Sequence, residues 1–130
     1  MKLLRYLWVS PATLVGLLLG AIALLGGARA RRVQGVIEVC GGGLHRVVCR
    51  LPEGLRFGAI TLGHVIVGLD AACLERARSH EQVHVRQYER WGIFFFPAYL
   101  GSSLVQLARG RDPYRDNCFE VEAFAKEARR

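Results

Sequence analysis

The sequence predicts an α+β fold in which an N-terminal transmembrane helix precedes a small antiparallel sheet and three further helices. Three observations support this prediction. Residues Tyr6 to Ala28 form a run of 23 residues without a charge, and the stretch from Val33 to Asp70 is punctuated by glycine and rich in Val and Ile. After Asp70, apolar residues recur with helical spacing. With 130 residues, the chain is long enough for one small domain and an anchor.

The uncharged run near the N-terminus is long enough to cross a bilayer, for which about 20 apolar residues suffice. Trp8 lies near its start, where aromatic rings favour the headgroup region. A cleaved signal peptide, with Ala28–Ala30 as an A-x-A-like site, is the alternative, but the run is long and arginines surround that site. We therefore expect residues 1–32 to form an uncleaved anchor with a charged junction, and residues 33–130 to form the folded domain.

The charge pattern favours a membrane as partner. The chain carries 18 Lys and Arg against 11 Asp and Glu, a net charge of +7. Lys2 and Arg5 flank one side of the apolar run and Arg29, Arg31 and Arg32 flank the other, so the positive-inside rule favours a cytoplasmic over an exported domain. Since no tract interleaves basic and aromatic residues, nucleic acid is not an expected partner.

The cysteines leave two interpretations open. Cys40, Cys49, Cys73 and Cys118 form no C-x-x-C pair, so a cysteine-based zinc site is not expected. If the domain is exported, Cys40 and Cys49 can form a disulfide. In a reducing compartment all four are expected as thiols.

Three segments with high β-propensity predict the antiparallel sheet. They are "VQGVIEV" (33–39), "LHRVVCRL" (44–51) and "AITLGHVIVGL" (59–69). The glycine-rich "CGGG" (40–43) and the segment "PEG" (52–54) predict turns between them.

A helix is predicted after Asp70, whose carboxylate can cap the first turn. Gly92 is its expected end. One face of this helix carries residues spaced by three and four positions: Cys73, Ala77, His80, His84, Tyr88 and Trp91.

Two more helices are predicted in the rest of the chain. The second uncharged run, Trp91–Ala108, contains Pro97 and several polar side chains. We expect it to be a buried core helix or one that lies at a membrane interface. The polar loop "RGRDPYRDN" follows, and "CFEVEAFAKEARR" predicts a helix with Asn117 as its cap.

The stretch "HEQVH" carries the candidate chemistry. Residues four apart on a helix share one face, so His80 and His84 can bind the same ion, and neutral imidazole suits zinc. Glu81, between them, is placed to act as general base on a water molecule at that ion. Glu120 or Glu122 in the later helix can complete a set of two histidines and one glutamate.

Four other polar side chains are secondary candidates. Tyr88 and Tyr114 could donate a hydrogen bond to an oxyanion, His64 could approach the metal, and Gln87 could hydrogen-bond near it. Ordinary core packing is the competing explanation for Tyr88 and His64.

The motif "HEQVH" with a later glutamate-bearing helix resembles the gluzincin metallopeptidases. The segment "EVEAF" is similar to the E-x-x-A-D segment of their membrane-associated type, and this resemblance implies that Glu120 is the third zinc ligand. The chain departs from that type at Phe124, where the type has an aspartate that supports a histidine ligand. "HEQVHVRQYERWG", "FFFPAYL" and "YRDNCFEVEA" also resemble small, uncharacterised bacterial membrane-associated proteins with one H-E-x-x-H motif, which imply no substrate.

The resulting hypothesis is a membrane-anchored, zinc-dependent peptidase with a zincin-like domain. His80, His84 and Glu120 would hold Zn²⁺, Glu81 would deprotonate the attacking water, and the substrate would be a peptide or protein. The alternative is a non-catalytic, membrane-associated metal-binding or scaffold protein, because so short a chain leaves little room for a substrate cleft.

Overall fold

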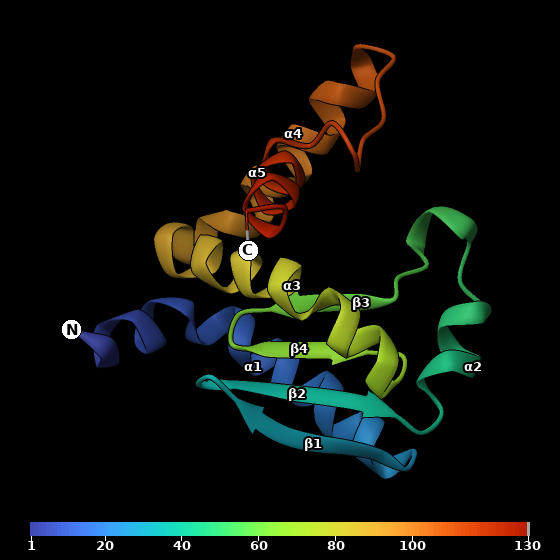
Figure 1. Cartoon of the computed structure of the whole chain (residues 1–130). Helices are drawn as coiled ribbons and strands as arrows, with labels where there is room; N and C mark the ends of the chain where they lie inside the picture. The colour runs from blue at the N-terminus through green and yellow to red at the C-terminus, as the bar shows by residue number, and fades with distance from the viewer. Residues whose placement is uncertain (130) are drawn as a thin grey trace.

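The structure is a computed structural model that describes residues 1–129, and it has the predicted α+β class with one mixed, four-stranded sheet (Figure 1). In chain order its elements, with η for a short 3-10 helix, are α1 (Lys2–Leu25), β1 (Ala28–Val33), β2 (Val36–Gly41), α2 (Leu44–Cys49), η1 (Glu53–Leu55), β3 (Ala59–Leu62), β4 (Val65–Gly68), α3 (Ala71–Trp91), η2 (Gly92–Phe94), α4 (Phe95–Ala108) and α5 (Cys118–Glu127).

The sheet lies between α1 and α3 (Figure 1). Successive side chains of a strand point to opposite faces, and β4 shows this alternation clearly. Val65 and Val67 pack on one face in a cluster with Ala23 of α1, whereas Ile66 packs on the other face with Leu74 of α3. The two helices therefore cover opposite faces of the same sheet, and both contribute to the core.

Small residues allow α1 to lie close to the sheet. A side chain added at Gly16 would place its Cβ 2.8 Å from the carbonyl oxygen of Leu62 and 2.8 Å from the Cβ of Val65. A Cβ at Gly20 would lie 3.2 Å from a methyl group of Val39. The structure thus confirms the expected N-terminal apolar helix and shows that it is packed on the domain. Whether it crosses a membrane stays a prediction.

The predicted charged junction at residues 29–32 is part of edge strand β1. Arg31 of β1 lies opposite Glu38 of β2, and a tight turn joins the two strands. Gln34 and Gly35 form this turn with φ angles of 51° and 82°, the backbone conformation of hairpin turns that match the twist of the sheet. The segment "VQGVIEV" therefore contains the end of one strand, a turn and most of the next strand.

The prediction of an antiparallel sheet was wrong, because β2 and β4 are parallel within the strand order β1-β2-β4-β3. Residues 42–64 connect them, and a connection of this length permits a parallel crossover. The segment "AITLGHVIVGL" forms two strands, since Gly63 adopts a φ of 63° and reverses the chain between β3 and β4.

The prediction of a strand at "LHRVVCRL" was also wrong, because residues Leu44–Cys49 form the helix α2. Val48 is buried and Leu44 is half-buried, while Val47 between them is exposed. The two buried side chains are four residues apart, which is the spacing of one helix face. The β-branched pair Val47 and Val48 suggested a strand, but burial follows the helical period.

The helix boundaries at Asp70, Gly92 and Asn117 are confirmed. The Asp70 carboxylate accepts a hydrogen bond from the N–H of Cys73 at 2.7 Å, and Gly92 ends α3 with a φ of 57°. The Asn117 side-chain oxygen accepts from the N–H of Phe119 at 3.0 Å and so caps α5. These caps lie in the sequence next to the helices that they begin or end.

The helix α4 projects from the domain and exposes much of its apolar surface (Figure 1). Phe95 is buried, but Phe96, Leu100, Leu104 and Leu107 are exposed. The prediction that this segment is a buried core helix is therefore wrong. By length and composition alone, two helical stretches are apolar enough to cross a membrane, Lys2–Leu25 and Ala71–Ala108.

All four cysteines lie in the described part of the chain and are free thiols. The structure contains no bond between Cys40 and Cys49.

A buried ion pair attaches α3 to the sheet. The Glu38 carboxylate is 1% exposed and accepts hydrogen bonds from the guanidinium of Arg78 at 2.7 Å and from that of Arg31 at 3.1 Å. Burial raises the pKa of Glu38, but the hydrogen bonds and charges of the two arginines outweigh it and hold the pKa below its usual value.

We predict that Arg78→Ala lowers the free energy of unfolding by about 3 kcal/mol, because it removes one partner of a buried charge. Since the depressed pKa of Glu38 stabilises the fold fully above its ordinary value of 4.5 and loses this effect as the pH falls from there through the depressed value, the loss in the variant should shrink below pH 4.5. Denaturant unfolding of both proteins from pH 7 to pH 3 measures this. Arg86→Ala, an exposed change in the same helix, should have little effect; an equal effect of the two changes would refute the prediction.

Gly16→Ala should destabilise the protein, whereas the matched change Gly101→Ala should stabilise it by up to about 1 kcal/mol through helix propensity. The difference arises because a Cβ at Gly16 meets the sheet at 2.8 Å, while a Cβ at Gly101 meets nothing within 4 Å. Thermal unfolding followed by circular dichroism compares the variants. If both changes stabilise, then α1 does not pack on the sheet as described.

Candidate metal centre

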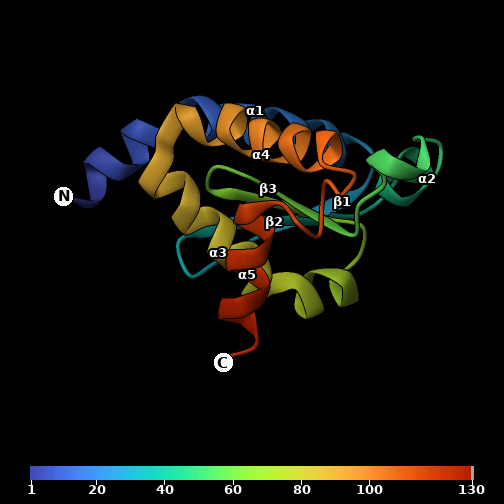
Figure 2. The same ribbon diagram turned by 90° about the horizontal axis from the view of Figure 1, so that it is seen from above.

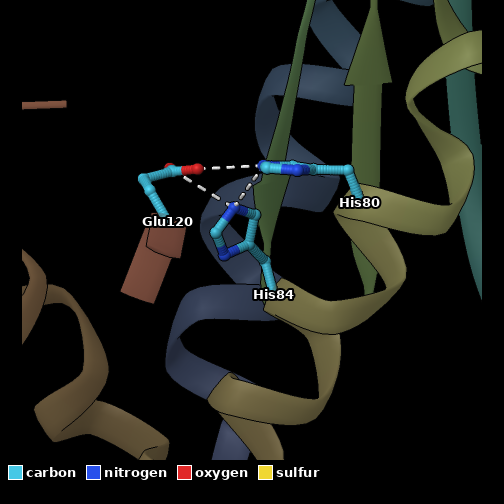
Figure 3. A group of neighbouring side chains, drawn as sticks. All are labelled: His80, His84 and Glu120. Carbon is cyan, nitrogen blue, oxygen red and sulfur yellow. Dashed lines mark hydrogen bonds and ion pairs between the residues drawn. The ribbon is translucent and has the colours of Figure 1, made fainter. Parts of the chain in front are cut away.

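Two helices bring together three buried side chains, His80 and His84 of α3 and Glu120 of α5 (Figure 3). The histidines stand one helical turn apart on the face of α3 that is turned toward α5, and the two helices make extensive contact. The three side chains are 6%, 6% and 3% exposed. Their polar ends point toward one common position, so the structure assembles the set of residues that the sequence predicts.

The mutual distances of the three groups match those expected around a tetrahedral ion. The Nε2 atoms of His80 and His84 are 3.2 Å apart, and the Glu120 oxygens lie 2.9 Å from His80 Nε2 and 3.3 Å from His84 Nε2. Ligand bonds of about 2.0–2.1 Å to zinc place two tetrahedral donors roughly 3.3 Å apart. The 2.9 Å contact is to Glu120 Oε2 and the 3.3 Å contact is to Oε1, so an ion of this size fits between the two rings and the carboxylate with little rearrangement.

Hydrogen-bond acceptors behind the rings fix the histidine tautomers. His84 Nδ1 lies 2.8 Å from the amide oxygen of Gln87, and His80 Nδ1 lies 3.3 Å from the carboxylate of Glu127. The Gln87 amide nitrogen donates to the carbonyl of Phe119, so the side-chain oxygen of Gln87 faces the ring of His84. We assign the proton of both rings to Nδ1, so both Nε2 lone pairs point into the centre, as in metal-binding histidines.

The centre is electrostatically prepared for a cation. Two lone pairs and one carboxylate meet there, and Tyr99 donates a hydrogen bond to Glu120 at 2.7 Å. Burial raises the pKa of Glu120, but Tyr99 and, when they are protonated at Nε2, the rings of His80 and His84 donate hydrogen bonds that outweigh it and lower the pKa to about 2. Burial lowers the pKa of each histidine, but the nearby Glu120 raises the pKa by a larger amount, so both pKa values lie above normal.

Glu81 lies beside the centre on the side of the sheet. Its carboxylate accepts a hydrogen bond from the hydroxyl of Thr61 in β3 at 2.6 Å, and the residue is 7% exposed. Burial raises the pKa of Glu81 above its usual value. A buried carboxylate held by a single hydroxyl keeps its other oxygen free for a proton.

Two cavities meet at Glu81. One, of about 310 Å³, is lined by Glu81, His84 and Glu120 together with strand β3 and apolar residues of α4. The other, of about 510 Å³, is lined by His80, Glu81 and the more polar side chains around Arg56 and Arg76. The centre is therefore accessible from two sides, although its ligand atoms are buried.

The remaining predicted candidates lie outside the group of three. Glu122 accepts hydrogen bonds from Gln87 and Lys126, so Glu120 is the carboxylate that joins the histidines. His64 faces Glu89 at 3.2 Å, as a paired core histidine does. Tyr88 packs in an apolar cluster that raises its pKa to about 12.

Tyr114 keeps its candidate role as a hydrogen-bond donor to substrate. It lies in the loop between α4 and α5, is 50% exposed and lines both cavities. Burial of the hydroxyl and the nearby carboxylates raise its pKa to about 12, so the phenol keeps its proton at neutral pH.

The structure confirms that Gln87 hydrogen-bonds near the centre, but the sequence did not assign the supporting roles of Glu127, Tyr99 and Thr61. Phe124, where the resembled type has aspartate, packs its ring 4.6 Å from the ring of His80. Glu127 lies seven residues after Glu120, which is two turns along the same face of α5, and this spacing could have identified it. The roles of Tyr99 and Thr61 depend on tertiary packing, which leaves no local pattern.

Comparison of the chain with protein-family models, with curated proteins and with solved structures gave no match. The interpretation of the centre therefore depends on its own geometry and chemistry.

We predict that Glu127→Ala weakens metal binding at least tenfold without unfolding the protein, because it removes the acceptor that orients His80. Competition with a chromophoric chelator measures the affinity for Zn²⁺. Glu127→Gln keeps an acceptor oxygen and should retain most of the affinity, while Glu75→Ala, an exposed carboxylate of α3, should change nothing. Equal affinities of wild type and Glu127→Ala would contradict the assigned role.

Proposed function

We propose that this chain is a membrane-associated, zinc-dependent peptidase of zincin-like character. The observation that carries the proposal is the convergence of two imidazole nitrogens and one carboxylate, within 2.9–3.3 Å of one another, beside a buried glutamate and a cavity. The resemblance of "HEQVH" and "EVEAF" to the gluzincins supports the same conclusion.

Zinc suits the donor set better than the other common ions. Two imidazole nitrogens and one carboxylate oxygen are typical catalytic zinc ligands, whereas Ca²⁺ and Mg²⁺ prefer six or more oxygens. When bound, zinc would supply a water molecule of lowered pKa and polarise a carbonyl group. Three protein ligands leave a fourth position for such a water.

Glu81 is the residue that moves the proton. Its carboxylate accepts the proton of the attacking water and then delivers it to the leaving amine, and the Thr61 hydroxyl holds it in place. Tyr114 is placed on the cavity wall to donate a hydrogen bond to the oxygen of the scissile carbonyl.

Strand β3 offers a surface on which a peptide can bind. It is an edge strand, and all four of its residues, Ala59 to Leu62, line the cavity next to Glu81. An extended peptide can pair with the free backbone groups of such an edge. The short chain thus builds a cleft from an edge strand and the adjoining helix α4, with Ile60, Phe95 and Phe96 favouring an apolar side chain.

The second candidate function is a non-catalytic metal-binding or scaffold protein at a membrane. The burial of all three ligand side chains favours it, because structural metal centres are typically buried, whereas the two cavities that reach the centre favour the peptidase. Both functions require the same three ligands, but only the peptidase requires Glu81 as a base.

Membrane association is part of both functions. The first 25 residues form an apolar helix that can serve as an anchor or as a signal sequence, and we propose the anchor because small residues fit it onto the sheet.

The decisive experiment measures zinc content and turnover in three proteins. Purified wild type should hold one Zn²⁺ per chain and hydrolyse an unstructured, fluorescently labelled protein substrate. His84→Ala should lose the metal. Glu81→Gln should keep the metal and lose turnover by about 10²–10⁴-fold, which is the usual contribution of a general base.

The outcomes separate the candidates. Stoichiometric zinc without turnover in wild type would support the metal-binding or scaffold function. Well-folded protein that takes up no zinc would refute both. Glu75→Gln, which removes an exposed charge of the same helix, is the control for non-specific effects.

A further inference from the structure

The helix α1 has two different apolar faces. The face on the sheet consists of small residues, with Gly16, Gly20 and Ala23 buried. The opposite face carries large side chains that are exposed by 57% to 90% and spaced at helical intervals: Leu4, Leu7, Leu14, Leu18, Ile22 and Leu25. The packing on the sheet therefore leaves the most hydrophobic side of the helix uncovered.

The helix α4 exposes a second apolar stripe on the same side of the molecule. Its exposed residues Phe96, Leu100, Leu104 and Leu107 follow the same spacing. Seen from above, α1 and α4 both lie along one side, and α3 and α5 lie on the other (Figure 2). The ten residues of the two stripes form the docking surface.

The charges around the docking surface match an anionic partner. No acidic residue occurs between Met1 and Ile37 or between Arg90 and Arg111. Basic side chains instead flank both helices at their ends, including Lys2, Arg29, Arg109 and Arg111, while Arg5 is paired with Glu89 at 3.7 Å. Anionic lipid headgroups attract such residues by about 1 kcal/mol each, while the acyl chains receive the leucines and phenylalanines.

The sheet decides how α1 can meet a bilayer. The helix contacts all four strands of the sheet, including the two edge strands β1 and β3. If α1 crossed the hydrocarbon core in this packing, unpaired backbone groups of these edges and charged side chains such as Arg29 and Arg32 would enter the lipid. Open sheet edges do not occur there, because each unsatisfied group costs several kcal/mol.

We propose that the docking surface lies in the plane of an anionic lipid bilayer, so that α1 rests in one leaflet beside α4 and does not cross the membrane. This inference deepens the membrane association of the proposed function but is independent of its metal chemistry. The metal centre between α3 and α5 then lies on the side of the sheet away from the lipid, and α4, whose Phe95, Phe96 and Tyr99 line the cavity, extends from the centre to the membrane.

The orientation of α1 can be tested with a different epitope tag at each terminus. The protein is reconstituted into sealed vesicles of phosphatidylcholine and phosphatidylglycerol (7:3) by detergent removal, and protease is added outside. If α1 lies in plane, each molecule has both termini on one side, so it keeps both tags or loses both. A crossing helix would instead leave every molecule with one tag, and this result would overturn the proposal.

The lipid contact of α4 is tested by Leu100→Ser, Leu104→Ser and Leu107→Ser combined. Partition onto these vesicles, measured by flotation, should weaken at least tenfold. The matched variant Val47→Ser with Val121→Ser, two exposed apolar residues outside the docking surface, should partition like wild type. Partition onto pure phosphatidylcholine should be weaker for all three proteins.

Circular dichroism serves as the fold control for these variants, because it reports on the helices and the sheet whether or not the protein binds zinc. Variants that keep the wild-type spectrum but partition normally would refute the role of α4. A protein that avoids vesicles and forms dimers in dilute solution would show that a second copy covers the docking surface, and the proposal would fail while the metal centre stood.

Discussion

Two imidazole nitrogens that face each other at 3.2 Å in a buried position are the constraint on which the rest of the structure depends. When both rings are neutral, with their protons on the far nitrogens, their lone pairs repel each other and the carboxylate of Glu120 unless a proton or a metal ion lies between them. The fold holds them together nonetheless: Asp70 caps α3, the buried Arg78–Glu38 pair attaches it to the sheet, and Gln87 binds the backbone of α5.

The sheet separates the chemistry of the molecule from its apolar surface. Strand β3 illustrates this, because Thr61 points to Glu81 on one face while Leu62 packs near Gly16 of α1 on the other. The helix α1, which resembles a membrane span in composition, thus also supports the strand whose other face contacts Glu81. The small residues at the contact allow both roles, since they bring the helix close without using its large side chains.

Local patterns made the metal centre predictable from the sequence, and non-local contacts account for what was missed. His80, Glu81 and His84 follow from helix spacing, and Asp70 and Asn117 mark the starts of the two helices. The parallel pairing of β2 with β4 depends on a long crossover. The arginine-rich β1 is a strand because it pairs with β2. Neither feature leaves a pattern in the residues of the strand itself. Phe124 offers no hydrogen-bond acceptor to His80, and Glu127 supplies one instead, which only the fold of α5 against α3 made evident.

We propose that His80, His84 and Glu120 coordinate one ion through nitrogen and oxygen. X-ray absorption at the zinc edge of the zinc-loaded protein tests this coordination. We expect four nitrogen or oxygen neighbours at about 2.0–2.1 Å and the outer-shell scattering of two imidazoles, which should fall to that of one imidazole or disappear in His84→Ala. Sulfur scattering at about 2.3 Å, or a spectrum without imidazole, would contradict it, because the metal would then be bound by the cysteines or at the surface.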